Sequence, residues 1–173
     1  GDFCEKVHEV LFFSRLPPEC LEIEITETAA MEEPEAVIAE LLKIKQLGVK
    51  ISIDDFGTGY SSLNYLKRLP IDILKIDKSF TMDIGKNEND EAIVRAVIAI
   101  AHSMKLEVIA EGVEELSQLV FLDQNLCDHV QGYYFSKPLT VEAFEKLLEG
   151  DICTVQYDLL DDARNHYFQT GTH

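Results

Sequence analysis

The feature that most constrains the fold is a regular alternation of short apolar runs with longer amphipathic stretches. The runs have the length and the aliphatic content of buried strands. They cover residues 21–27, 50–56, 73–77, 107–111 and 129–135. Strands that alternate with helices form parallel sheets with right-handed crossovers. The pattern therefore predicts an α/β fold, and by itself it leaves open a doubly wound sheet or a barrel.

Helix signals fill the intervals between the apolar runs. Pro34 stands where a first helical turn is expected, and Gly48 follows the expected end of that helix. Asn89 or Asp90 is expected to cap the next long helix, and Ser61 or Ser62 a short one that ends at residue 69. The long helix should bury one stripe, made of Ile93, Val97, Ile100, Ala101 and Met104. Two further helices are predicted over residues 115–124 and 140–148.

Polar groups gather where the apolar runs end. In chain order they are Glu27, Asp54 with Asp55, Lys75 with Asp77, Glu111, and Gln131. The carboxyl ends of parallel strands meet at one edge of a sheet, so these side chains should lie close together. A single acid there could simply cap a helix. Several carboxylates together repel one another, and a divalent cation such as Mg²⁺, Mn²⁺ or Ca²⁺ would relieve that repulsion.

Two details of these strand ends refine the expectation. Asp54 and Asp55 are neighbours, so both can reach one site only where the strand ends and the chain turns, for which Gly57 and Gly59 are suited. Lys75 could hold a phosphate oxygen or orient an attacking water. Its alternative role is a buried salt bridge with Asp77 or Asp55.

The charge of the chain limits its partners. The formal net charge is -17, which disfavours polymeric nucleic acid, although metals could still mediate binding of a small phosphate ligand. The four cysteines lack metal or disulfide spacing, and no apolar run is long enough to span a membrane. These features predict a cytoplasmic protein, or the cytoplasmic part of a membrane-anchored one.

The polar strand ends belong to longer strings that resemble the EAL family of cyclic-di-GMP phosphodiesterases. The resemblance extends in order and spacing over about residues 2–148. Its strings are Glu24-Ile25-Thr26-Glu27, Asp54-Asp55-Phe56-Gly57-Thr58-Gly59-Tyr60-Ser61-Ser62, Leu74-Lys75-Ile76-Asp77-Lys78-Ser79-Phe80, Ala110-Glu111-Gly112-Val113-Glu114, and Gln131-Gly132-Tyr133 with Lys137-Pro138-Leu139. The family fold is a TIM-like barrel with one antiparallel strand. The implied reaction is hydrolysis of cyclic di-GMP to linear pGpG with Mg²⁺ or Mn²⁺.

The resemblance also implies roles for individual residues. The implied metal ligands are Glu27, Asp54, Asp55 and Glu111, with Asp54 bridging two metals. Lys75 would position the attacking water, Gln131 would hydrogen-bond near it, and Asp77 and Glu114 would support them. A regulatory loop would couple the metal site to a homodimer interface, and it consists of Phe56, Gly57, Thr58, Gly59, Tyr60, Ser61 and Ser62. A sensory domain is expected upstream.

The family motif Glu-Ala-Leu does not occur in the sequence. Residues 1–149 are therefore interpreted as family strands 4–8 of a partial barrel that lacks its N-terminal third, and residues 150–173 as a C-terminal extension. Exposed strand edges would favour pairing or swapping with a second copy. The two-metal site would be incomplete, so this chain alone should hydrolyse almost nothing. The alternative function is a degenerate, non-catalytic EAL module that acts as a nucleotide receptor or a dimerisation domain.

Overall fold

The computed structural model describes residues 3–57 and 63–149. Within these residues, five parallel strands form one sheet in the order β1-β2-β3-β4-β5. They are β1 (Glu22–Thr26), β2 (Lys50–Phe56), β3 (Ile73–Ile76), β4 (Glu107–Ala110) and β5 (His129–Val130). Strands in chain order wind in one direction, as in a (β/α) barrel, whereas a doubly wound sheet reverses its order. The predicted α/β class is confirmed, and the structure selects the barrel-type winding.

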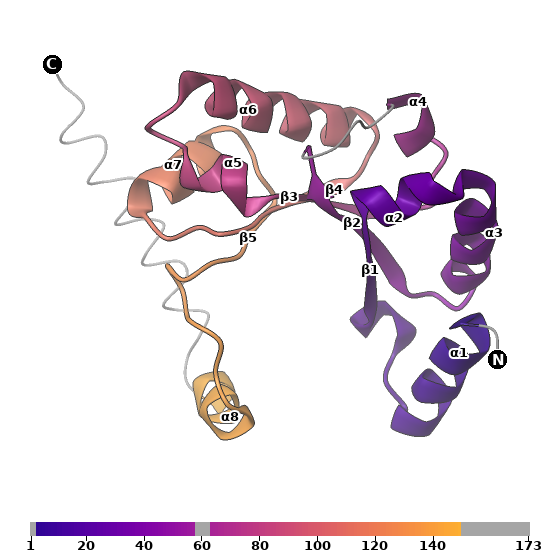
Figure 1. Cartoon of the computed structure of the whole chain (residues 1–173). Helices are drawn as coiled ribbons and strands as arrows, with labels where there is room; N and C mark the ends of the chain where they lie inside the picture. Colours follow the sequence, from indigo (N-terminus) through magenta and orange to yellow (C-terminus); the bar gives the residue numbers. More distant parts are fainter. Residues whose placement is uncertain (1–2, 58–62, 150–173) are drawn as a thin grey trace, which may run out of the picture.

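Helices connect the strands. They are α1 (Phe3–Ser14), the 3-10 turn η1 (Pro18–Cys20), α2 (Glu27–Glu32), α3 (Pro34–Lys45), α4 (Leu63–Leu66), α5 (Lys78–Met82), α6 (Glu88–Ser103), α7 (Leu116–Gln124) and α8 (Val141–Glu149). Figure 1 shows α2, α4, α5 and α6 above the sheet, whereas α1 and α8 hang below its two ends. No helix within the described ranges is long and apolar enough to cross a bilayer.

The core lies between one face of the sheet and the helices packed against it, among them α3, α6 and α7. Ile51, Ile53, Leu74, Ile76 and Val108 point to this side and are at most 1% exposed. Alternate residues of the same strands point to the other face, because side chains alternate along a strand. That other face carries polar groups, among them Asp54 and Lys75. Only strand residues on this polar face can contribute side chains to a site.

Several local expectations needed correction. Asn87, rather than Asn89 or Asp90, caps α6, because its side chain accepts a hydrogen bond from the Asn89 backbone N–H. Ile93 is 38% exposed, and Val94 is buried in its place. The last strand stops at Val130 because the next residues turn and bond to the Val113 backbone instead. The predicted caps Ser61 and Ser62 and the predicted extension over residues 150–173 lie outside the described residues.

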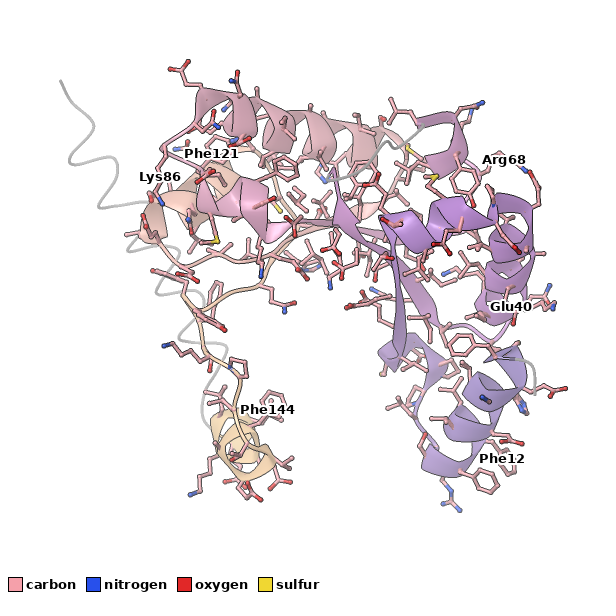
Figure 2. All side chains as sticks on the ribbon, in the orientation of Figure 1. Phe12, Glu40, Arg68, Lys86, Phe121 and Phe144 are labelled. Carbon is pink, nitrogen blue, oxygen red and sulfur yellow. The ribbon has the colours of Figure 1, made fainter. Side chains whose placement is uncertain are left out.

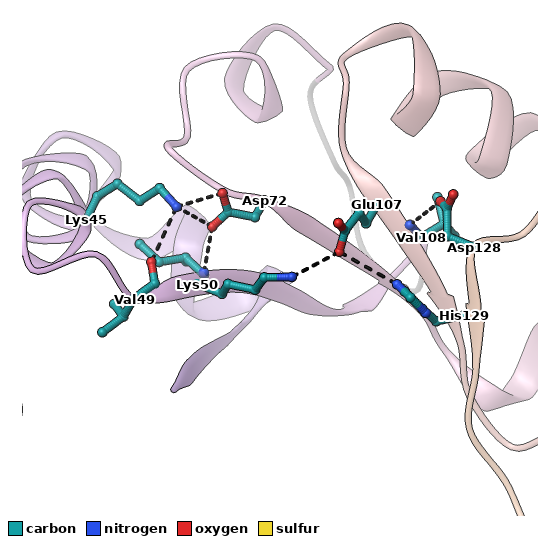
Figure 3. Close-up of polar contacts among 9 residues, drawn as sticks. Lys45, Val49, Lys50, Asp72, Glu107, Val108, Asp128 and His129 are labelled. Carbon is teal, nitrogen blue, oxygen red and sulfur yellow. Dashed lines mark hydrogen bonds and ion pairs between the residues drawn. The ribbon is translucent and has the colours of Figure 1, made fainter. Parts of the chain in front are cut away.

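The amino ends of the strands are joined by a polar network (Figure 3). Asp72 accepts hydrogen bonds from the Ile51 backbone N–H at 2.9 Å and from Lys45 Nζ at 2.6 Å. Its own backbone N–H donates to Ile51, and its carbonyl accepts from Glu107. Asp72 therefore ties β2, β3 and β4 together opposite the edge that carries the predicted site.

Replacing Asp72 with Ala is expected to reduce the free energy of unfolding by about 1–3 kcal/mol, because the buried Ile51 N–H loses its acceptor and the Lys45 ammonium loses its ion pair. The measurement is urea denaturation. Glu35→Ala is the matched control, since it removes an exposed ion pair with Arg68 whose value is below about 1 kcal/mol. Equal losses in the two variants would contradict the role given to Asp72.

Candidate functional site

A β-bulge at the end of β2 brings two neighbouring aspartates to one edge of the sheet. Ile53 pairs with Leu74 and Phe56 with Ile76, so Asp54 and Asp55 together stand opposite the single residue Lys75. Asp55 has a φ of 57°, which a residue other than glycine rarely adopts. Bulges of this kind redirect side chains and are common beside active sites. Because of the bulge, the carboxylates of Asp54 and Asp55 can both face the same edge of the sheet.

Lys75 is the centre of the site. Its side chain is 6% exposed, and its Nζ lies 2.7 Å from Glu111 Oε1, 2.8 Å from Glu24 Oε1 and 3.7 Å from Asp54 Oδ1. These three carboxylates come from β1, β2 and the residue after β4, and each faces a shared position. We call Glu24, Asp54, Lys75 and Glu111 the strand-end cluster. It confirms that polar groups from several strands meet at one edge.

The charges within the site shift two pKa values. Burial opposes the charged form of Lys75, but its hydrogen bonds to Glu111 and Glu24 outweigh burial and raise the pKa of the ammonium group. Partial desolvation, followed by the negative charges of Asp54 and Asp77, raises the pKa of Asp55. The lysine therefore stays protonated at neutral pH.

Glu27 contacts the start of the predicted regulatory loop. It is the first residue of α2, is 2% exposed, and its Oε2 accepts a hydrogen bond from the Gly57 backbone N–H at 2.9 Å. Its Oε1 is buried and has no hydrogen-bond partner among the residues that the structure describes. Glu24, which the sequence reasoning left without a role, takes the position beside Lys75. The period of two along β1 could have found it, because Glu24 is the acidic residue that precedes the strand end on one face.

The other predicted site residues, Asp77, Gln131 and Glu114, make contacts of different kinds. Asp77 caps α5 by accepting from the Ser79 backbone N–H and hydroxyl. Burial alone would raise the pKa of Asp77, but these hydrogen bonds lower it. Gln131 follows β5 and has an exposed side chain, and its backbone N–H donates to Ala110, beside Glu111. The Glu114 side chain is exposed, and its backbone N–H donates to Gln118.

The start of the predicted regulatory loop is held on both sides. Glu27 accepts from the Gly57 N–H, and a Cβ at Gly57 would lie 3.0 Å from the Phe80 ring. Phe56 is buried in the core. Thr58, Gly59, Tyr60, Ser61 and Ser62 lie outside the described residues.

The donor set of the strand-end cluster fits a hard divalent cation. Across residues 3–57 and 63–149, no group of three or more His, Cys, Asp or Glu side chains is arranged to hold a metal ion. At the strand-end cluster, the Lys75 ammonium group lies between the carboxylates of Glu24 and Glu111. Carboxylate oxygens that converge on a cation are nevertheless the ligands that Mg²⁺ and Mn²⁺ take in proteins.

The EAL domain family model matches residues 1–138. The chain belongs to the EAL domain family. An EAL relative in *Pseudomonas aeruginosa*, the cyclic di-GMP phosphodiesterase NbdA, is 53% identical over 130 residues, which cover 75% of this chain and 17% of NbdA. This chain thus spans a small part of the curated relative's length.

Solved EAL domains have the same fold. The EAL domain of *Mycobacterium smegmatis* DcpA is 41% identical with a TM-score of 0.80, and the match covers 85% of this chain and 66% of that domain. *Klebsiella pneumoniae* BlrP1, solved with manganese and cyclic di-GMP, is 33% identical with a TM-score of 0.73. That match covers 78% of this chain and 34% of BlrP1. BlrP1 therefore holds a divalent metal together with the dinucleotide.

Proposed function

We propose that this chain supplies the metal-binding edge of a cyclic-di-GMP phosphodiesterase domain. The observation that carries the proposal is the convergence of Glu24, Asp54 and Glu111 on Lys75 at the carboxyl ends of parallel strands. The comparisons support it, since NbdA is named for this activity and BlrP1 binds manganese and cyclic di-GMP. The substrate is proposed as cyclic di-GMP and the product as linear pGpG.

Glu24, Asp54, Asp55 and Glu111 would hold Mg²⁺ or Mn²⁺, and Glu24 takes the place first predicted for Glu27. A bound divalent ion would lower the pKa of a water and neutralise charge on the attacked phosphate. Lys75 keeps its proton and donates hydrogen bonds, so it can orient the attacking oxygen or a phosphate oxygen. The carboxylate of Glu111 keeps Lys75 in place at 2.7 Å.

We propose that Asp77, Gln131 and Glu114 support the site without binding the metal. Asp77 holds the start of α5 and bears on the pKa of Asp55. Gln131 directly follows β5 and has an exposed side chain, and its backbone N–H bonds to Ala110, the residue before Glu111. Glu114 follows Glu111 in the loop that leads to α7, and its proposed role is to support that loop.

We propose that Glu27 anchors the regulatory loop instead of binding metal. Its hydrogen bond to Gly57 and the contact of Gly57 with Phe80 support this role. The regulatory loop would then couple the conformation of the metal site to that of a homodimer interface. A homodimer, an upstream sensory domain and a cytoplasmic setting remain part of the proposal.

The test is a chimera in which the matched stretch of this chain replaces its 130-residue counterpart in NbdA. The chimera is expected to hydrolyse cyclic di-GMP to pGpG, measured by chromatography. Glu111→Gln in the chimera should lower the rate by roughly 100-fold, because a carboxylate that serves both the metal and Lys75 is lost. The chain alone is expected to show negligible hydrolysis.

A chimera that folds and binds cyclic di-GMP but does not hydrolyse it would overturn the enzymatic proposal. That result would favour the receptor function instead. Hydrolysis by the chain alone, at the rate of NbdA, would contradict the expectation that the site is incomplete.

A further inference from the structure

The start of the regulatory loop and the helix that follows it are both attached to the same pair of helices. The loop covers residues 56–62, and α4 begins directly after it. At the start of the loop, Gly57 donates its backbone N–H to Glu27, the first residue of α2. Within α4, the Tyr65 hydroxyl donates to the Pro34 carbonyl at 3.0 Å, and Pro34 is the first residue of α3.

The two helices that carry these acceptors are closely joined. α2 ends at Glu32, α3 begins at Pro34, and Glu33 alone lies between them. The helices also contact each other, and α2 contacts β1 and β2. Glu27 and Pro34 therefore belong to one connected support, so their positions relative to each other are fixed by the packing of α2 and α3.

Tyr65 is the stronger contact between α4 and this support. It is 8% exposed, so its hydroxyl depends on the Pro34 carbonyl for a hydrogen bond. Burial raises the pKa of the phenol although the charge of Arg68 opposes this, so the hydroxyl stays protonated and can donate. Figure 2 shows Arg68 beside α3, where it pairs with Glu35 at 2.8 Å. That ion pair is exposed and therefore contributes little.

The backbone just before the loop needs to be held. Asp55, two residues before Gly57, has a φ of 57°, which costs energy for a residue other than glycine. Such conformations persist where the surrounding structure over-determines them. The bulge that directs Asp54 and Asp55 to one edge includes this residue. Contacts on both sides of the loop would limit the freedom of Asp55 to relax.

We propose that Tyr65 is a positioning residue that acts together with Glu27: the two hold the regulatory loop from both sides and so keep Asp55 in its left-handed conformation. Tyr65 acts through the backbone between α4 and β2. Its effect on metal binding rests on the proposed function, whereas its effect on the backbone at Gly57 does not. The alternative is that core packing of Leu66, which is fully buried, holds α4 by itself.

The test replaces Tyr65 with Phe in the full chain, which removes the hydroxyl and keeps the buried ring. Hydrogen exchange of the Gly57 amide should accelerate by about fivefold, as expected for the loss of one hydrogen bond. Asn125→Ala is the matched control, because Asn125 also donates a side-chain hydrogen bond to a carbonyl, that of Phe121, but at the end of α7. In this control, Gly57 exchange should stay within about twofold of the unaltered chain.

Isothermal titration with Mn²⁺ gives the second readout. Tyr65→Phe should weaken Mn²⁺ binding by about three- to tenfold, and Asn125→Ala should leave it unchanged. Gly57 exchange that is unaltered in Tyr65→Phe, or equally faster in both variants, would overturn the proposal. Unchanged Mn²⁺ affinity in Tyr65→Phe would also overturn it if the unaltered chain binds Mn²⁺. Selectively faster Gly57 exchange in a chain that binds no Mn²⁺ would support the anchor and contradict the proposed metal site instead.

Discussion

Gly132→Ala is expected to cause the largest loss of stability of any conservative substitution considered for this domain. A Cβ at Gly132 would lie 2.0 Å from the Val113 carbonyl oxygen and 2.3 Å from the Val113 nitrogen. Both are backbone atoms held by hydrogen bonds, from Tyr134 to the oxygen and from the nitrogen to Gln131. The chain cannot accommodate the methyl group without moving two backbone segments. We expect the free energy of unfolding to fall by about 3 kcal/mol or more.

Chemical denaturation followed by circular dichroism measures this loss, and Gly85→Ala is the matched control. Gly85 also has an unusual backbone, with a φ of +83°, but a Cβ there would meet nothing within 4 Å. Its cost should be limited to backbone strain of about 1–2 kcal/mol. If Gly132→Ala were no more harmful than Gly85→Ala, the close crossing of the β5 end and Val113 would not exist as described.

Glu24→Gln is expected to weaken Mn²⁺ binding to the chain by roughly 10- to 100-fold, because it removes one negative charge from the strand-end cluster. Glu27→Gln should change the affinity by less than about threefold, since its amide oxygen can still accept from Gly57. Isothermal titration with Mn²⁺ gives both constants. The comparison separates the ligand assignment made from the sequence from the one made from the structure.

Glu22→Gln serves as the control for a general charge effect. Glu22 lies on the same strand and the same face as Glu24, two residues away, and no ion pair joins it to Lys75 among the described contacts. The Mn²⁺ affinity of the Glu22→Gln variant should match that of the unaltered chain. A larger loss in Glu27→Gln than in Glu24→Gln would return the metal role to Glu27.

The sequence predicted the sheet well because its strands carry a strong local signal. The aliphatic runs at residues 50–56 and 73–77 are bounded by turn residues, and both became strands within one residue of the prediction. The meeting of Asp54, Lys75 and Glu111 also followed from local information, because parallel strands place their carboxyl ends at one edge. Chain-order winding did not follow, since strand alternation is common to barrels and doubly wound sheets.

What could not be predicted depends on contacts between distant residues. Whether Glu24 or Glu27 enters the cluster is decided by where β1 ends, and Thr26 ends it by capping α2 through a hydrogen bond from the Ala29 N–H. The shortness of β5 depends on backbone hydrogen bonds that join Gln131 and Tyr134 to Val113, which lies 18 and 21 residues earlier in the chain. The role of Asp72 likewise requires knowing that Lys45 and Ile51 approach it in space.

The measurement that tests the central claim most directly is the site-resolved broadening of backbone NMR signals by substoichiometric Mn²⁺. A chain with a net charge of -17 has many places for weak cation binding, so location matters more than affinity. We predict that signals near Glu24, Asp54 and Glu111 broaden first. Earlier broadening at the acidic start of α6, around Glu88, Asp90 and Glu91, would contradict a metal site at the strand-end cluster.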